Sequence, residues 1–269
     1  MSTPLHIVVC GSLVPDPLQT LEPVTTPQGP GLKNETMLPS VLDPWSAHAL
    51  FEAANLAKQV AGSKVWLVSL GPKGKLQQLM MTVAQKVPFE LVAIDGSASG
   101  FTDAHLVAAA LADAIQAIPG LDKNNLLVFG GCASASRDAS VTMQLVCERL
   151  GISEFFAGVD EIKPQADGSF NVLERIEGGK YQASTFTGAP AVLAWATGNL
   201  PEPPNNPQVG MLNMRGVMPA LQKAKAVAIN AGGIAYEKAE IPAQNRDTRI
   251  VKDMPADDIA KEIVEWLKA

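Results

Sequence analysis

The stretch Leu126–Gly151, with the sequence LLVFGGCASASRDASVTMQLVCERLG, decides the fold. An apolar run of strand character ends at two glycines, small and hydroxylated residues follow, and a helical pattern begins near Asp138 and runs to Leu150. A strand, a loop and a helix start in this order present free backbone N–H groups that suit a phosphate, and the hydroxyls of Ser140 and Thr142 add donors. The alternative is that Asp138 and Ser140 only cap the helix, since Asp and Ser are common N-caps.

The rest of the N-terminal half repeats this alternation of short apolar runs and longer amphipathic ones. We predict buried strands at residues 5–10, 64–70, 89–95 and 125–130, and helices at residues 43–61, 73–86, 102–118 and 138–150. Such alternation builds an α/β fold, a doubly wound and mostly parallel sheet with helices on both faces. Ligands of these sheets bind at the carboxyl ends of the strands.

The pattern changes after Gly151. Two antiparallel strands joined at Gly178-Gly179, followed by another buried strand, form a predicted hairpin addition. Residues 198–216 are rich in Pro and Asn and predict an exposed loop without regular structure. Residues 255–269 predict a helix, and its apolar stripe is open unless something packs on it; the stripe consists of Ile259, Ile263, Trp266 and Leu267. We therefore divide the chain into a nucleotide-binding domain, 1–225, and a C-terminal arm, 226–269.

Composition limits the function. A net charge of -6 with no basic cluster, and only 5% aromatic residues, argue against a nucleic-acid partner. The three Cys and three His are scattered and form no metal or disulfide pattern. No apolar run approaches the roughly 20 residues that span a bilayer, and the N-terminus has no signal-peptide character, so we expect a soluble cytoplasmic protein without membrane insertion.

Neither a P-loop nor a G-x-G-x-x-G motif follows the first strand. Five segments nevertheless occur in order: VVCGSLVPDP at 8–17, LDPWSAHALFEAANLAKQ at 42–59, VWLVSLGP at 65–72, the loop after residue 130, and RIEGGKYQ at 175–182. Over residues 5–225, this order resembles the β subunit of electron transfer flavoproteins, the family that includes the FixA proteins.

The resemblance implies an electron carrier rather than an enzyme. Such a β subunit pairs with an α subunit that carries the redox-active FAD, and it holds AMP itself, or a second FAD in electron-bifurcating members. A flavin dehydrogenase would be the electron donor and a membrane quinone oxidoreductase the acceptor.

The resemblance also implies site residues. Those at the cofactors are Cys10, Asp43, Trp45, Leu70, Gly130, Asp138, Ser140, Val141, Thr142 and Gln144, and Pro17 falls with Trp45 near the α-subunit flavin. Met214 occupies the anchor position for the donor dehydrogenase, with Met211 and Leu212 beside it.

The sequence departs from the family at several of these positions. In DASVTMQ, 138–144, Ser140, Val141 and Met143 replace Asn, Gln and Gly, and Gly11-Ser12-Leu13-Val14 replaces the basic residues after the first strand. Two other functions therefore stay open. One is a small-molecule enzyme of the adenine-nucleotide-binding α/β class, using Asp16, Asp43 and Asp138. The other is a monomeric nucleotide sensor.

Overall fold

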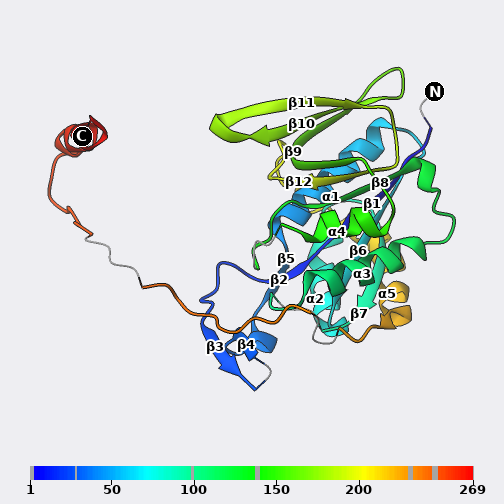
Figure 1. Cartoon of the computed structure of the whole chain (residues 1–269), viewed down its shortest axis with the longest axis horizontal. Coiled ribbons are helices and arrows are strands. Elements are labelled where there is room, and N and C mark those ends of the chain that lie inside the picture. The colour runs from blue at the N-terminus through cyan, green and yellow to red at the C-terminus, as the bar shows by residue number, and fades with distance from the viewer. Residues whose placement is uncertain are drawn as a thin grey trace. The chain divides into compact units, whose positions relative to one another are not determined.

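The structure is a computed structural model that describes residues 3–27, 29–97, 100–136, 140–229, 233–243 and 248–268. The chain forms two compact units, Met1–Ala239 and Glu240–Ala269. The larger unit is built on a nine-stranded sheet in the order β11-β10-β9-β12-β8-β1-β6-β7-β13 (Figure 1). The strands are β1 His6–Cys10, β6 Lys64–Gly71, β7 Glu90–Asp95, β8 Leu126–Gly131, β9 Phe155–Pro164, β10 Phe170–Ile176, β11 Lys180–Phe186, β12 Ala191–Trp195 and β13 Lys225–Ala226.

Among the described strands of this sheet, β10 alone runs in the opposite direction, antiparallel to β9 on one side and β11 on the other, and all other neighbouring pairs are parallel. Two small ribbons, β2 with β5 and β3 with β4, are inserted between β1 and the first helix. Their strands are β2 Leu13–Pro15, β3 Pro23–Thr26, β4 Gly29–Leu32 and β5 Ser40–Leu42. The predicted fold class, a mostly parallel α/β sheet with a hairpin addition, is confirmed. The strand β9 and the two small ribbons were not predicted.

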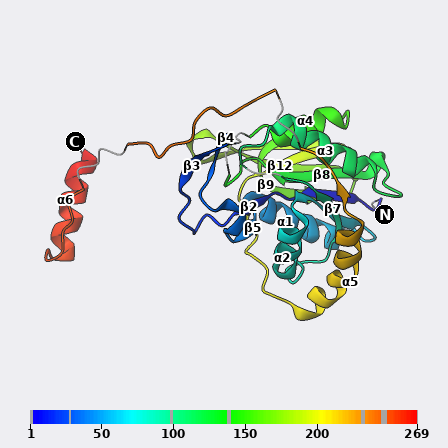
Figure 2. The ribbon, with the colours of Figure 1, turned by 90° about the horizontal axis from the view of Figure 1, so that it is seen from below.

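Helices cover both faces of the sheet (Figure 2). They are α1 Pro44–Gln59, α2 Lys73–Val83, α3 Ala104–Gln116, α4 Thr142–Arg149 and α5 Pro207–Lys223. One hydrophobic core lies between the sheet and α1, α2 and α5, and a second lies between the sheet and α3 and α4. The four predicted N-terminal helices are all present, although α4 begins at Thr142, four residues later than the sequence pattern indicates.

Helix α5 corrects the prediction that residues 198–216 form a loop. The chain is irregular to Asn206, whose side chain accepts hydrogen bonds from the N–H groups of Gln208 and Val209, and Pro207 occupies the first helical position. The buried positions 210, 213, 217 and 221 form one stripe of a helix. The prediction was wrong because residues that break a helix in its interior are favourable at its N-terminus.

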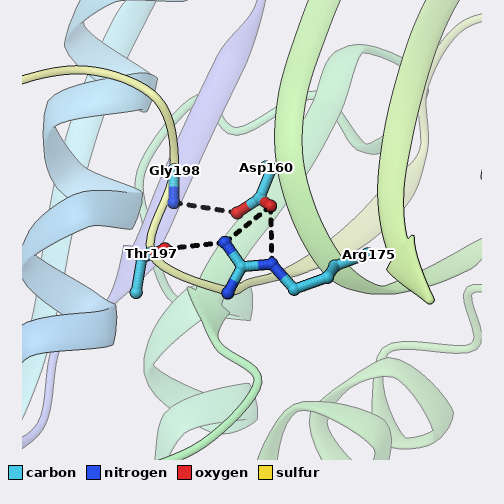
Figure 3. Close-up of polar contacts among 4 residues, drawn as sticks. All are labelled: Asp160, Arg175, Thr197 and Gly198. Carbon is cyan, nitrogen blue, oxygen red and sulfur yellow. Dashed lines mark hydrogen bonds and ion pairs between the residues drawn. The ribbon is translucent and has the colours of Figure 1, made fainter. Parts of the chain in front are cut away.

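Charged side chains fix the segment 196–206, which links β12 to α5. Asp160 of β9 is fully buried; its carboxylate accepts the Gly198 N–H at 3.1 Å and pairs with Arg175 of β10 at 2.8 Å (Figure 3). The same guanidinium donates to the Thr197 hydroxyl at 2.9 Å. Beside this network, the buried Glu52 of α1 accepts hydrogen bonds from the next two backbone N–H groups, those of Asn199 and Leu200. The segment therefore depends on two buried carboxylates.

Glu52 predicts a pH dependence of stability. Burial raises the pKa of Glu52 from 4.5 to about 7, against the opposing effect of its two N–H donors. The folded state therefore binds a proton more tightly than the unfolded chain, and this contribution to the free energy of unfolding falls as pH rises from about 4.5 to about 7. Across that window we expect Glu52→Gln to gain roughly 3 kcal/mol relative to the wild type, because the rise of the pKa from 4.5 to about 7 is worth about 1.4 kcal/mol for each unit.

Urea unfolding of both proteins between pH 4.5 and pH 8.5 measures this difference directly, because the other titrating groups are common to both. Lys58→Gln, on the same helix, serves as a control in which the difference stays constant with pH. A constant difference for Glu52→Gln would show that Glu52 has the same pKa in the folded and unfolded states, contrary to this prediction.

The smaller unit contains α6, Ala256–Lys268, so the predicted C-terminal helix is confirmed. Arg249 forms an ion pair with Glu262 within this unit. The side chains of Ile263, Trp266 and Leu267 are exposed by 47%, 65% and 82%. The helix therefore has an amphipathic pattern and an open apolar stripe.

Candidate functional site

A pocket lies at the carboxyl ends of the central strands. Its floor is formed where β1, β6 and β8 end, and α3 and the start of α4 form its walls. Strand β1 lies between β6 and β8, and the strand order reverses at this place in the sheet. Doubly wound sheets bind their ligands at such a switch point. The pocket volume is about 100 Å³.

Five predicted residues from three separate segments meet in this pocket. They are Cys10 at the end of β1, Leu70 in β6, and Ser140, Val141 and Thr142 at the start of α4. The structure therefore brings together residues that are up to 132 positions apart in the sequence.

Among the described residues, the predicted cofactor residues Gly130, Gln144 and Trp45 lie outside the pocket lining. Gly130 lies beneath α4, where a Cβ would stand 2.3 Å from the Met143 sulfur. Gln144 is exposed on α4, and Trp45 is half-buried at the start of α1. Asp138 lies outside the described residues, so its predicted role stays a prediction.

Asp43 is buried beside the pocket and serves the surrounding backbone. One carboxylate oxygen accepts the Trp45 N–H at 3.1 Å, which caps α1. The other accepts the Ser134 hydroxyl at 2.7 Å and the Ala135 N–H at 2.8 Å, which ties the loop after β8 to α1. Burial raises the pKa of Asp43, and these hydrogen bonds oppose the rise.

The start of α4 offers donors to an anion. Its N-cap position is Val141, which has no side chain that caps the helix, so the first-turn N–H groups lack the partner that Ser or Asp supplies elsewhere. The preceding Ser140 has a φ of 54°, a left-handed conformation uncommon for a residue with a side chain. Such conformations are frequent where backbone groups are aimed at a ligand.

The pocket is lined by hydroxyls, backbone groups and apolar side chains. Among its described lining residues none carries a charge, because burial raises the pKa of the Cys10 thiol to about 12 and keeps it neutral. These described lining residues would therefore hold an anion by dipoles rather than by a positive charge. Gly131 permits a close backbone approach here, since a Cβ would lie 2.6 Å from that of Trp45 and 2.8 Å from the carbonyl oxygen of Ala133.

These features test the fit of a nucleotide. Hydroxyls and helix N–H groups suit a phosphate and a sugar, so the lining has the right chemistry. The volume of about 100 Å³ is below the roughly 300 Å³ at which pockets for whole small molecules begin. The pocket thus fits one end of a nucleotide, with the rest of the ligand at its mouth.

Sequence reasoning missed much of the lining. The missed residues are Gly11, Ser12, Leu13, Val14, Ser46, Gly100, Val107, Leu111, Gly131, Cys132, Ala133, Ser134, Ser136 and Met143. The rule that ligands bind at the carboxyl ends of strands would have found those directly after β1 and β8. No local signal marks Val107 and Leu111, which have the pattern of ordinary core positions of α3.

A second hollow lies between α2 and α5. Its lining includes Met81, Met211 and Met214, with Arg215 at its side. Met211 and its neighbour Leu212 are exposed by 66% and 64%, whereas Met214 packs partly against the core. Two of the three predicted partner-recognition residues are therefore on the surface of a helix rather than on a loop.

Two candidate acids of the enzyme alternative have structural partners. Asp16 accepts a hydrogen bond from the Leu18 N–H in a turn. Both carboxylate oxygens of Asp43 already accept hydrogen bonds from the protein. Within the described part of the chain there is no cluster of three or more His, Cys, Asp or Glu side chains placed to hold a metal. Nor is any described helix long and apolar enough to cross a membrane.

A doubly wound sheet with a pocket at its switch point is the arrangement in which α/β proteins bind nucleotides and other ligands. Within this class of α/β proteins, the electron transfer flavoprotein domain matches residues 34–231, and the chain belongs to this family. Proteins of the family bind flavin and nucleotide and form α/β heterodimers. Among curated proteins, no sequence matches the chain.

Proposed function

We propose that this chain is the β subunit of a heterodimeric electron transfer flavoprotein. It carries electrons from flavin dehydrogenases to a membrane quinone reductase, with FAD held mainly by the α subunit. The observation that carries the proposal is the pocket at the ends of β1, β6 and β8, because it gathers residues from the segments that resemble β subunits. The match to the electron transfer flavoprotein domain supports the same conclusion.

In this proposal, FAD supplies the electron transfer and this chain supplies a nucleotide site and binding surfaces. The pocket holds the phosphate of AMP, or that of a second FAD if the complex bifurcates electrons, on the α4 N–H groups and the hydroxyls of Ser140 and Thr142. No described pocket residue is placed as a general base with an orienting partner, and a carrier needs none.

The arm 226–269 docks on the α subunit through α6. Its exposed stripe, Ile263, Trp266 and Leu267, is the apolar surface that such contact removes from water, at about 25 cal/mol per Å². Co-expression with a candidate α subunit tests the function: we expect a yellow heterodimer that survives size-exclusion chromatography with light scattering. Trp266→Ala should weaken it, while the exposed but non-apolar Lys261→Ala serves as the control. A chain that stays a stable monomer beside every α subunit would favour the sensor or enzyme alternatives.

Thr142 predicts the nucleotide content of that heterodimer. Replacing its hydroxyl in Thr142→Val removes a hydrogen bond to a charged phosphate, which is worth about 1.5–3 kcal/mol. We expect tenfold or greater loss of AMP affinity, with the α-subunit flavin retained. Mass spectrometry of released nucleotide and calorimetric titration measure the effect, and Glu148→Gln, exposed at the other end of α4, is the control. Flavin without any adenine nucleotide in the wild-type complex would mean that Val141 and Met143 have abolished the site.

A further inference from the structure

Two serines of the loop after β8 and Asp43, the N-cap residue of α1, form a chain of three hydrogen-bonding side chains. The Ser134 hydroxyl lies 2.7 Å from the Asp43 carboxylate, and the Ser136 hydroxyl lies 2.8 Å from that of Ser134. The Ser136 N–H also donates to the Ser134 oxygen at 3.2 Å. Asp43 is buried outside the pocket, whereas Ser134 and Ser136 line it.

The direction of these bonds follows from the hydrogen count. Asp43 is surrounded by donors, the N–H groups of Trp45 and Ala135 and the Ser134 hydroxyl, which is the environment of an ionised carboxylate. A serine hydroxyl has one hydrogen, and that of Ser134 is used on Asp43. In the contact between the two serines, Ser136 must therefore be the donor.

This bond direction determines what the Ser136 hydroxyl offers to the pocket. Its hydrogen points toward Ser134, so its oxygen offers only lone pairs to the pocket. Gly100 lies next to Ser136, and a Cβ on Gly100 would stand 3.3 Å from the Ser136 Cβ. The lack of a side chain at Gly100 therefore leaves room for the Ser136 side chain. The pocket thus has an acceptor at Ser136 and donors at the start of α4.

We propose that Asp43 is a positioning residue that makes Ser136 an acceptor for a sugar hydroxyl of the ligand, while the start of α4 takes the phosphate. The inference rests on the proposed nucleotide site and specifies how it selects its ligand: a phosphorylated ribose with a free hydroxyl. A phosphate alone satisfies only the donors, because a phosphate oxygen facing Ser136 would meet lone pairs.

Calorimetric titration of the purified full-length protein, as the heterodimer, with AMP, 2′-deoxy-AMP and 3′-deoxy-AMP tests this specificity. We expect one deoxy analogue to bind the wild type about tenfold more weakly than AMP, the factor that about 1.4 kcal/mol represents. In Ser136→Ala, an exposed position that carries little folding risk, this ratio should fall to about one.

Asp43→Asn gives the sharper variant. It removes the negative charge that orients the Ser134 hydroxyl, so the direction of the bond between Ser134 and Ser136 is no longer fixed and the ratio should move toward one. Glu148→Gln, exposed on α4 and outside the pocket lining, is the control and should leave the ratio unchanged.

The outcomes separate the two claims. Equal wild-type affinity for AMP and both deoxy analogues, or an unchanged ratio in Ser136→Ala, overturns the role of Asp43 and Ser136 but leaves the nucleotide site standing. No binding of AMP to the wild type overturns the nucleotide site, and this inference falls with it.

Discussion

Arg175→Met is expected to lower the free energy of unfolding by about 3 kcal/mol. Asp160, its partner, is completely buried, and the substitution leaves that carboxylate without its cation. Losing one partner of a buried pair costs about 3–5 kcal/mol, because the remaining charge is not solvated. The lower end applies here, since the Arg175 side chain is 48% exposed and water can approach the position it vacates. Methionine keeps the apolar stem, so the change isolates the charge and its hydrogen bonds.

A control lies on the neighbouring strand. Lys163 of β9 pairs with Glu161 at 2.7 Å, but both side chains are more accessible to water than Asp160, at 63% and 30% exposure. Lys163→Met should cost less than about 1 kcal/mol, as exposed ion pairs do. Urea unfolding of both variants measures the contrast.

The double variant makes the explanation falsifiable. Asp160→Asn in the Arg175→Met background removes the unpaired charge while its amide oxygen still accepts the Gly198 N–H, so part of the lost stability should return. If the double variant is less stable than Arg175→Met alone, the unpaired charge is not the origin of the loss.

Elements that show in the pattern of adjacent residues could be predicted from the sequence, whereas elements that depend on contacts between distant residues could not. The strands 64–71 and 126–131 were found because a buried parallel strand is an uninterrupted apolar run, a property of adjacent residues. The class of the fold follows from the alternation of these runs with helices. Helix α5 was missed for a second reason besides its Pro- and Asn-rich start, because some of the interactions that stabilise it come from far along the chain. The Asn213 amide donates to the carbonyls of Ala84 and Val87, and its oxygen accepts the Phe89 N–H.

In the candidate site, too, local features were predictable and long-range contacts were not. Asp43 was recognisable as an N-cap from its neighbour Pro44, but its bonds to Ser134 and Ala135 cross 91 and 92 positions and leave no local pattern. The sequence therefore indicates which residues follow the strands. It does not indicate which carboxylate is used by the backbone and which hydroxyls face the ligand.

The surface of α5 around Met211, Leu212 and Met214 forms the proposed contact with the donor dehydrogenase. Proline at the start of α5 and the capping Asn206 make this surface rigid before binding, which lowers the entropy cost of ordering it. Helices α2 and α5 contain no acidic residue, and Arg215 lies beside the methionines, so the surface suits an apolar partner patch with acidic neighbours. Methionine adapts its shape to more than one such patch.

Truncation of these side chains should separate binding from folding. Met211→Ala and Leu212→Ala remove exposed groups, so we expect little change in thermal stability. Truncation of the residue that serves as the central anchor should weaken donor binding by about 2 kcal/mol, or roughly thirtyfold. Met214 is predicted to be that anchor, yet it also packs against the core, so Met214→Ala should lower both the rate of electron transfer and the melting temperature.

Stopped-flow reduction of the heterodimer by the donor measures the rate as a function of donor concentration, and reduction by dithionite is the control that bypasses docking. Met81→Ala, on the α2 side of the same hollow, tells whether the whole hollow is used. If all these variants accept electrons from the donor as fast as the wild type does at subsaturating concentrations, α5 is not the docking surface. A loss of rate in Met214→Ala alone, in proportion to its loss of stability, would assign Met214 to the core.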